Sequence, residues 1–428
     1  MFPDNWQIRT LSFFVSELQA GVSVNSEDRP CRSGEIGILK TSAITGGNFN
    51  PQEHKAVLLR EHNRVKVSPE EDSIIVSRMN TLELIGESSY IVKSYFELFL
   101  PDRLWLLKFR DRNVVSVKWL SYVLSSQKAR SYIQLHSTGT SGSMKNLPQS
   151  RFLDMPILSP SFKEQQKIAE ILDTVEKAIA LTQTHINKLK LAKAGLLHDL
   201  LTKGIDEHGE LRNPKRNPEQ FKDSSLGKIP KDWEVKTCES LCKEIVVGIV
   251  IRPAQYYQSS GVPVLRSANI RETGINGSDL VFMSEKANQM LSKSMIKVGD
   301  ILTVRTGYPG ISSVVSQKWD SCNCVDLIIS RPSCEIDSYF LTLWINSDFG
   351  KGQVFRGQGG LAQQHFNVGE LQKLLVIKPL IDEQQKITAA FFNYNARIQK
   401  KQTRLEKLKL LKLGLMSDLL TGKVRVKI

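Results

Sequence analysis

The sequence lacks the patterns of a membrane or secreted protein. Its 428 residues contain no apolar run of 18 or more residues, so no transmembrane helix is predicted. No signal-peptide pattern follows Met1. The six cysteines form no Cys-x-x-Cys pair and no Cys/His zinc spacing. These absences predict a cytoplasmic protein with free thiols, no membrane association and no metal site.

Motifs of nucleic-acid enzymes are missing as well. There is no Gly-x-x-x-x-Gly-Lys-Ser/Thr loop for ATP, and no Asn-Pro-Pro-aromatic or Asp-Pro-Pro-aromatic tetrapeptide for amino methylation. Pro101-Asp102 could begin a nuclease triad, but no Asp/Glu-x-Lys follows it, so Asp102 is predicted to be a turn residue. The seven histidines are scattered, and those at 185 and 198 are predicted to lie on a helix surface. No catalytic residue is therefore predicted.

What the sequence does contain is a long internal repeat. Residues 164–202 reappear without a gap at 383–421, sharing 19 of 39 positions, and both copies begin EQQKI. The match continues outside the helix: FPDNWQIRT around Trp6 corresponds to IPKDWEVKT around Trp233. Such self-similarity indicates two copies of one large module.

The repeat divides the chain into two variable regions, each followed by a constant helix. The predicted segments are a first variable domain at 1–160, a helical spacer and linker at 161–226, a second variable domain at 227–380 and a terminal helix at 381–428. Residues 203–227 are polar and contain two Asn-Pro pairs, so they are predicted to be a linker.

Each constant helix carries apolar residues at alternating spacings of three and four, which is typical of a coiled coil. The two seams can bury each other, and antiparallel packing makes the modules equivalent about a pseudo-twofold axis. Gly195 and Gly414 recur in the two copies, which indicates either a kink or close backbone approach, or an accident of duplication. The predicted interface residues are Ile168, Leu172, Val175, Ile179, Leu189, Leu196, Ile387, Phe391, Ile398, Leu405, Leu408 and Leu415.

The variable regions read as mixed α and β structure, so the fold class is α+β. Short β-branched runs predict strands near 72–79, 262–270, 299–307, 311–317 and 326–330. Helical spacing occurs at 119–136 and 339–355. Each helical segment is followed by a polar loop, at 137–146 and 356–367.

These loops suit recognition better than catalysis, although an ordinary surface loop is the alternative. Arg pairs with guanine, and Gln or Asn with adenine, in the DNA major groove. The net charge of +14 agrees with a polyanionic partner, and residues 383–428 hold 11 Lys/Arg against three acids. A solvated Lys-rich helix face would explain that excess equally well. The candidate DNA-binding residues are Arg60, Arg78, Thr140, Ser141, Lys145, Asn146, Arg252, Arg266, Arg305, Tyr308, Arg356, Gln358, Gln363, Gln364 and His365.

Taken together, EQQKI at 164 and 383, GLLHDLLTKG, GLMSDLLTGK and LGKIPKDWEVKT resemble the specificity (S) subunits of Type I restriction-modification enzymes. The resemblance spans the whole chain. It implies two α/β target recognition domains, each reading one half of a bipartite double-stranded DNA site. It also implies two long helices that form an antiparallel coiled coil, set the spacer and bind two methyltransferase (M) subunits.

In that scheme the chain is non-catalytic and holds no cofactor. The partner subunits carry S-adenosylmethionine, ATP and Mg, and restriction (R) subunits cleave the DNA. Two alternatives stay open: a self-contained DNA-modifying enzyme fused to a recognition domain, and a coiled-coil scaffold without a DNA role. The missing tetrapeptide disfavours the first, and two divergent domains in matching frames disfavour the second.

Overall fold

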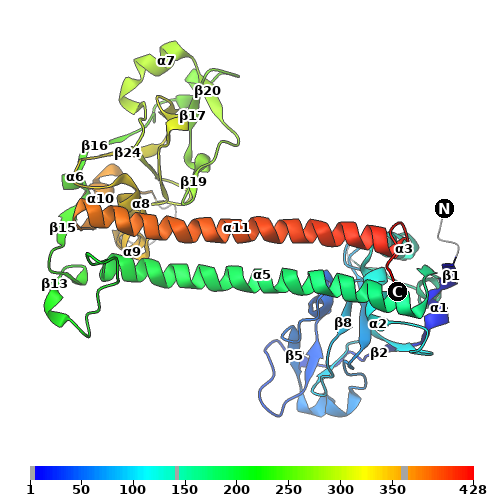
Figure 1. The fold of residues 1–428 in the computed structure, drawn as a ribbon. Helices are drawn as coiled ribbons and strands as arrows, with labels where there is room; N and C mark the ends of the chain where they lie inside the picture. Colours follow the sequence, from blue (N-terminus) through cyan, green and yellow to red (C-terminus); the bar gives the residue numbers. More distant parts are fainter. Residues whose placement is uncertain (1–4, 140–143, 358–364) are drawn as a thin grey trace. The chain divides into compact units, whose positions relative to one another are not determined.

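A computed structural model describes residues 5–139, 144–357 and 365–428, with only the backbone described for residues 355–357. The chain divides into two units (Figure 1). The first combines Met1–Thr184 with Thr403–Ile428, and the second is His185–Gln402. Both long helices therefore contribute one half to each unit. None of the described helices has the length and apolar character needed to cross a membrane.

The first unit is built on an antiparallel sheet with the strand order β2-β10-β6-β8. A second sheet has the order β3-β5-β4-β9, and its β4 and β9 run parallel. Two pairs complete the unit, β1 with β12 and β7 with β11. The strands are β1 (Gln7–Thr10), β2 (Val15–Ala20), β3 (Ser26–Glu27), β4 (Gly37–Leu39), β5 (His54–Val57), β6 (Ser73–Ser77), β7 (Met79–Asn80), β8 (Ser88–Ile91), β9 (Leu98–Phe99), β10 (Leu104–Phe109), β11 (Lys145–Asn146) and β12 (Pro156–Ser159). The helices are α1 (Leu11–Phe14), η1 (Thr41–Gly47), η2 (Leu59–Arg64), α2 (Val117–Ser125), α3 (Gln127–His136) and α4 (Gln149–Leu153).

The second unit repeats this plan. Its main antiparallel sheet has the order β16-β24-β21-β22, and its second sheet, β20-β17-β23, again contains a parallel pair. The strands are β13 (Phe221–Ser224), β14 (Gly227–Pro230), β15 (Glu234–Thr237), β16 (Cys242–Val247), β17 (Val262–Leu265), β18 (Ile270–Arg271), β19 (Gly274–Ile275), β20 (Val281–Met283), β21 (Ile301–Val304), β22 (Ser312–Val314), β23 (Asn323–Cys324), β24 (Leu327–Pro332) and β25 (Leu375–Lys378). The helices are η3 (Pro218–Gln220), α6 (Cys238–Leu241), η4 (Pro253–Tyr256), η5 (Ser267–Asn269), α7 (Glu285–Met290), η6 (Ser292–Ser294), η7 (Gln317–Trp319), α8 (Ser338–Asn346), α9 (Asp348–Gly357) and α10 (Val368–Lys373).

Strand register confirms the repeat residue by residue. Gln7 pairs with Ser159 in the first unit, and Glu234 pairs with Lys378 in the second. These positions differ by 227 and 219 residues, which are the offsets of the Trp6 and EQQKI matches. The α+β fold class is confirmed, and a strand overlaps each predicted run. The run at 262–270 is not one strand, because β17 ends at Leu265 and η5 follows at Ser267–Asn269.

The predicted helical segments each contain a break. α2 ends at Ser125 and α3 starts at Gln127, with the Ser126 side chain accepting from the Ala129 amide. In the second unit, the Ser347 hydroxyl between α8 and α9 accepts from the Gly350 amide. In each segment a serine caps the start of a second helix. The apolar periodicity continues across this serine, which is why it predicted one helix where the structure has two.

The long helices are α5 (Phe162–Thr202) and α11 (Ile381–Leu420). In the first unit, Ile168 and Leu172 of α5 share a core with Met416 and Leu419 of α11. In the second, the α5 residues Leu200 and Leu201 share a core with Ile387. In each unit an early part of one helix meets a late part of the other, so the segments run antiparallel as predicted.

The predicted seam positions are all withdrawn from solvent. Ile168, Leu172, Ile387, Phe391, Ile398 and Leu405 are buried, and the other six are half-buried. A salt bridge between Lys412 and Glu176 lies beside the seam in the first unit. In the second, the ammonium of Lys193 lies 4.5 Å from the ring centre of Phe391. Lys412 and Lys193 therefore each have a partner beside the seam.

Two predictions about the helix region are wrong. A Cβ atom added at Gly195 or Gly414 would meet nothing within 4 Å, and both helices continue through these residues, so no close backbone approach explains the glycines. The segment 203–227 is not a simple linker either. It contains η3, β13, an isolated bridge from Ile205 to Leu211, and a buried Ile205 side chain.

Candidate nucleic-acid interface

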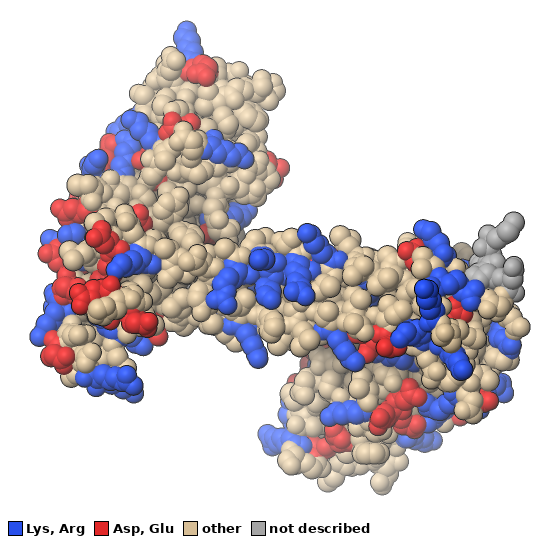
Figure 2. Space-filling model, viewed as in Figure 1, with Lys and Arg blue, Asp and Glu red and all other residues tan. Residues whose placement is uncertain are grey.

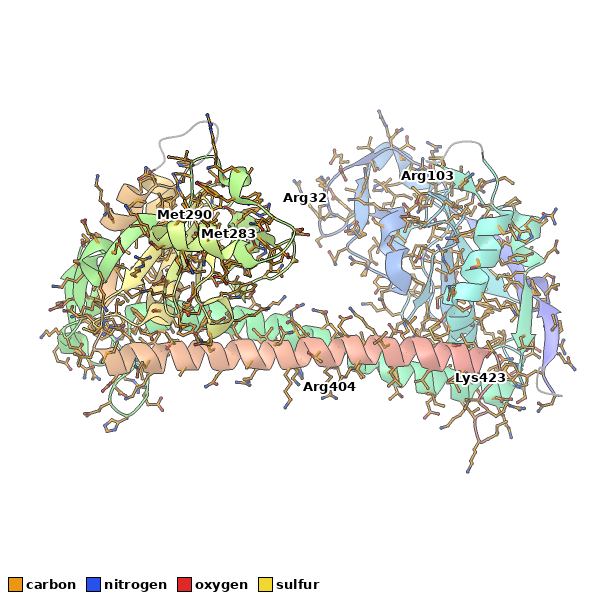
Figure 3. The ribbon with its side chains drawn as sticks, turned by 90° about the horizontal axis from the view of Figure 1, so that it is seen from above. Arg32, Arg103, Met283, Met290, Arg404 and Lys423 are labelled. Carbon is orange, nitrogen blue, oxygen red and sulfur yellow. The ribbon has the colours of Figure 1, made fainter. Side chains whose placement is uncertain are left out.

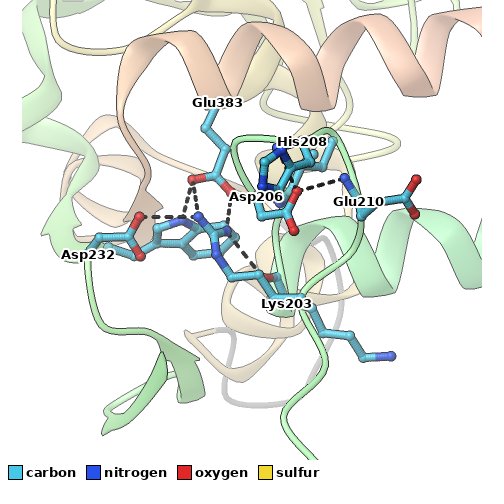
Figure 4. Close-up of polar contacts among 9 residues, drawn as sticks. Lys203, Asp206, His208, Glu210, Asp232 and Glu383 are labelled. Atoms are coloured by element: carbon cyan, nitrogen blue, oxygen red, sulfur yellow. Dashed lines mark hydrogen bonds and ion pairs between the residues drawn. The ribbon is translucent and has the colours of Figure 1, made fainter. Parts of the chain in front are cut away.

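A buried carboxylate ties the second variable region to its helix (Figure 4). Glu383, at the start of α11, is 7% exposed. It accepts hydrogen bonds from Trp233 Nε1 at 2.9 Å, Arg212 Nη1 at 2.5 Å and the amide of Ile205 at 2.8 Å. Burial lowers the pKa of Arg212, but the ion pair with Glu383 outweighs it and the net direction is upward. One carboxylate therefore joins the helix start, the domain start and the segment after α5.

The first unit has the same cluster with a differently placed arginine. Glu164, at the start of α5, is fully buried and accepts from Trp6 Nε1 at 3.1 Å. Arg425 donates to it from Nε at 2.6 Å and from Nη2 at 3.0 Å, and this pairing raises the pKa of the guanidinium. The cation comes from the segment after α11 here, and from the segment after α5 in the second unit.

The next residue of each EQQKI motif also has a defined role. Gln165 Oε1 accepts from the Ser116 amide just before α2 at 2.9 Å, and its Nε2 donates to the carbonyl of Pro160. Gln384 makes the equivalent contacts with the Asp337 amide at 2.7 Å and the carbonyl of Pro379. These side chains fix the orientation of α2 and α8 relative to the long helices, and so position each polar loop.

Each polar loop returns to the same backbone position of its unit. In the first, the amide of Leu147 donates to the carbonyl of Arg78 at 2.8 Å, beside the β7–β11 pair. In the second, the amide of Phe366 donates to the carbonyl of Arg305 at 2.8 Å, and His365 bridges to Thr306. Two residues predicted to bind DNA thus occupy matching positions where the loops meet the sheets.

In the second unit Arg305 and His365 are in contact. Arg305 Nη1 pairs with Asp326 at 2.6 Å, and Nη2 lies 2.6 Å from His365 Nε2. Tyr308, three residues after Arg305, is 77% exposed. The interaction keeps Arg305 near the sheet, with its side chain 15% exposed.

Arg266 and Arg252, also predicted to bind DNA, are placed differently in the second unit. Arg266 donates to the carbonyl of Asp279 at 2.6 Å and precedes η5. Arg252 is exposed and precedes η4, with a left-handed φ of 45°. The structure therefore joins Arg305 to His365 without joining these two to the same contact.

In the first unit, β7 and β11 bring Arg78 near Lys145 and Asn146. Lys145 Nζ donates to the carbonyl of Gly139 at 2.6 Å, which ties the two ends of the loop together. Arg78 lies over the Trp105 ring, 5.8 Å from its centre. Arg60 is exposed on η2.

Charge is not confined to the loops. Figure 2 shows Lys and Arg side chains gathered along the long helices, beside regions where both signs alternate. Arg404 of α11 is exposed (Figure 3). Among the described residues, no group of His, Cys, Asp or Glu could hold a metal ion. The described cysteines are free, and burial raises the pKa of the Cys322 thiol to about 11.

Comparison with known proteins decides which family has this architecture. The model of the Type I restriction modification DNA specificity domain matches residues 3–191 and 230–410.

The chain belongs to this specificity-domain family.

Relatives in the family cover nearly the whole chain. It is 23% identical to the putative type I restriction enzyme MjaX specificity subunit of Methanocaldococcus jannaschii, over 99% of this chain and 95% of the relative. It is 25% identical to the MjaVIII specificity subunit of the same organism, over 75% of this chain and 74% of the relative. The crystal structure of a Type I S subunit from M. genitalium shares the fold, with a TM-score of 0.57 and 14% identity over 99% and 97% of the two chains. The resemblance inferred from the motifs is confirmed.

Several predicted contacts of this specificity-family chain lie outside the described residues. They are Thr140, Ser141, Gln358, Gln363, Gln364 and the side chain of Arg356. The sequence analysis also missed Arg212 and Arg425. The one sequence feature that pointed to them is that an arginine follows each repeated helix within ten residues. Gln165 and Gln384 could have been found because the same polar residue occupies the second position of both EQQKI motifs.

Proposed function

We propose that this chain is the DNA-reading subunit of a Type I restriction-modification complex and is itself non-catalytic. Each variable region reads one half of a bipartite double-stranded site. The observation that supports this most directly is that both polar loops are attached to their sheets in the same way. The amide of Leu147 donates to the carbonyl of Arg78, and the amide of Phe366 donates to the carbonyl of Arg305. Two frames of one topology present two unrelated loops, an arrangement that suits two independent half-sites.

The partners follow from this role. Two methyltransferase subunits bind the long helices, and restriction subunits join them in the complete enzyme. S-adenosylmethionine, ATP and Mg belong to those partner subunits. This chain contributes position and base preference, because contacts to phosphates orient a protein on DNA while contacts to base edges select the sequence.

The test is an exchange of modules followed by methylome sequencing. Residues 1–160 are replaced by the first domain of another family member, and the chimera is expressed with its methyltransferase subunit. One half of the methylated motif is expected to change, while the other half and the spacer are retained. A change in both halves together would show a single composite reading surface and overturn the proposal of two independent readers.

A second measurement addresses catalysis. The purified chain is expected to methylate no DNA alone, and adding the methyltransferase subunit is expected to restore sequence-specific adenine methylation. The readout is tritium transfer from labelled S-adenosylmethionine to duplex DNA. Transfer by the chain alone, at a rate that follows the chain through purification, would favour the self-contained enzyme instead.

A further inference from the structure

Arg78 and Arg305 occupy matching positions, but the residues next to them carry opposite charges. Each arginine directly follows an inner strand of its main sheet, β6 in the first unit and β21 in the second. The paired strand begins at Leu104 opposite Ser77 in the first unit, and at Leu327 opposite Val304 in the second. The residue before that strand therefore lies next to the arginine. It is Arg103 in the first unit and Asp326 in the second.

In the second unit, the neighbouring acid neutralises the arginine. Asp326 Oδ1 lies 2.6 Å from Arg305 Nη1, and its Oδ2 accepts from the Thr306 hydroxyl at 3.1 Å. The remaining terminal nitrogen of Arg305 faces His365, at the end of the polar loop. Both terminal nitrogens of this guanidinium are thus engaged among the described residues, while its buried Nε, like that of Arg78, has no partner there. The side chain connects the sheet to the loop and has no net charge to offer a ligand.

In the first unit, the same position has no acid. The amide of Arg78 donates to the carbonyl of Arg103 at 3.0 Å, which places the backbones of the two arginines side by side, and Arg103 is exposed (Figure 3). No ion pair joins Arg78 or Arg103 to a carboxylate in the described ranges 5–139, 144–357 and 365–428. Among the residues that the structure describes, Arg78 donates from Nη2 only to the sulfur of Met79, at 3.7 Å, and its buried Nε has no partner. Lys145 adds a third cation across the β7–β11 pair.

A guanidinium without a counter-ion, at a strand end whose neighbour is a second arginine, is suited to a phosphate. Its planar donors match two phosphate oxygens, and charge-assisted bonds of this kind are about twice as strong as neutral ones. Binding an anion there would give Arg78 the counter-ion that Asp326 gives Arg305.

We infer that Arg78 and Arg103 form a site for a DNA backbone phosphate in the first unit, whereas Arg305 is a positioning residue that holds the second polar loop. The inference rests on the proposed function. It assigns different roles to two arginines at matching positions. The first unit uses this position for sequence-independent affinity. The second uses it to fix the loop from which base preference arises.

The experiment measures how binding depends on salt. The complex of this chain with its methyltransferase subunits is titrated with fluorescent duplex DNA carrying the methylated motif, and with an unrelated duplex, from 50 to 300 mM KCl. Each phosphate contact contributes about −0.9 to the slope of log K against log salt concentration on duplex DNA. The variants are Arg78→Gln, Arg78→Lys, Arg305→Gln and, as a control of equal charge change in the first unit, Arg9→Gln. Arg9 lies on β1, over the Phe13 ring and bonded to Gln7.

Arg78→Gln is expected to reduce the slope by about 1 and to weaken binding to both duplexes alike. Arg78→Lys keeps the charge and should restore most of the slope. Arg305→Gln should leave the slope unchanged while reducing the preference for the second half-site roughly tenfold. Arg9→Gln should behave like the unsubstituted chain.

An unchanged slope in Arg78→Gln, or an equal loss of slope in Arg305→Gln, would overturn the inference. Arg78→Lys guards against misfolding, since a slope that stays low with lysine present would show structural damage and count against a phosphate contact. If the unsubstituted complex bound neither duplex, the proposed function would fail first, independently of the assignment of Arg78.

Discussion

The buried Glu383 cluster predicts a large and local loss of stability when its cation is removed. The Arg212 side chain is 13% exposed, and Arg212→Met keeps its aliphatic stem but deletes the guanidinium. The carboxylate of Glu383 then keeps only the N–H donors of Trp233 and Ile205. Removing one partner of a buried ion pair costs about 3–5 kcal/mol because the remaining charge is uncompensated. Two retained donors place the expected loss near the lower bound, at about 3 kcal/mol.

Urea denaturation and hydrogen exchange together measure this loss. A domain has a free energy of unfolding of about 5–15 kcal/mol, so a loss of about 3 kcal/mol should shift the midpoint clearly. Exchange should increase first around residues 205–237, which include the cluster residues Ile205, Arg212 and Trp233. The double variant Arg212→Met with Glu383→Gln removes both charges and should recover much of the stability, since the buried carboxylate is no longer ionised.

Arg425→Met is the matched control in the first unit. The Arg425 side chain is 39% exposed, although that of Glu164 is fully buried, so water can replace part of the lost hydrogen bonding. The expected loss is smaller than for Arg212, and its exchange should rise near residues 5–10. The reasoning would be refuted if Arg212→Met left the urea midpoint unchanged, or if the double variant were less stable than the single one.

Further predictions concern the seam, the spacer and acid stability. Leu172→Ala is expected to cost about 2–5 kcal/mol in urea denaturation because the side chain is fully buried, whereas Leu410→Ala, at a position 68% exposed, should be nearly neutral. Inserting one helical turn into both long helices is expected to lengthen the spacer of the methylated motif while both half-sites are kept, because a helix extends about 1.5 Å per residue; altered half-sites would contradict this. Hydrogen bonding from Arg29 lowers the pKa of Glu35 to about 2. Since this folded-state pKa lies below the unfolded one, its contribution is present above about pH 4.5 and should be lost as the pH falls toward 2, so Glu35→Gln should flatten that part of the stability–pH curve.

Periodic and repeated features were predictable from the sequence. Seam residues such as Leu172 and Ile398 follow a 3.5-residue spacing that reports helix geometry directly, and both are buried. The motifs shared by the two copies indicated two units of one topology, which strand register confirmed. The family followed from the same motifs. Each of these features depends on neighbours within a few residues, or on comparing the chain with itself.

The paired charges were decided by the tertiary structure. Arg212 lies ten residues after Thr202, whereas Arg425 lies four after Thr421, so no fixed offset relates them. Their bonds to Glu383 and Glu164 span 171 and 261 residues. The contrast between Asp326 beside Arg305 and Arg103 beside Arg78 likewise exists only once the strands are paired. Side-chain pairing across such separations depends on where the sheets bring the backbone together, and spacing along the chain carries no record of it.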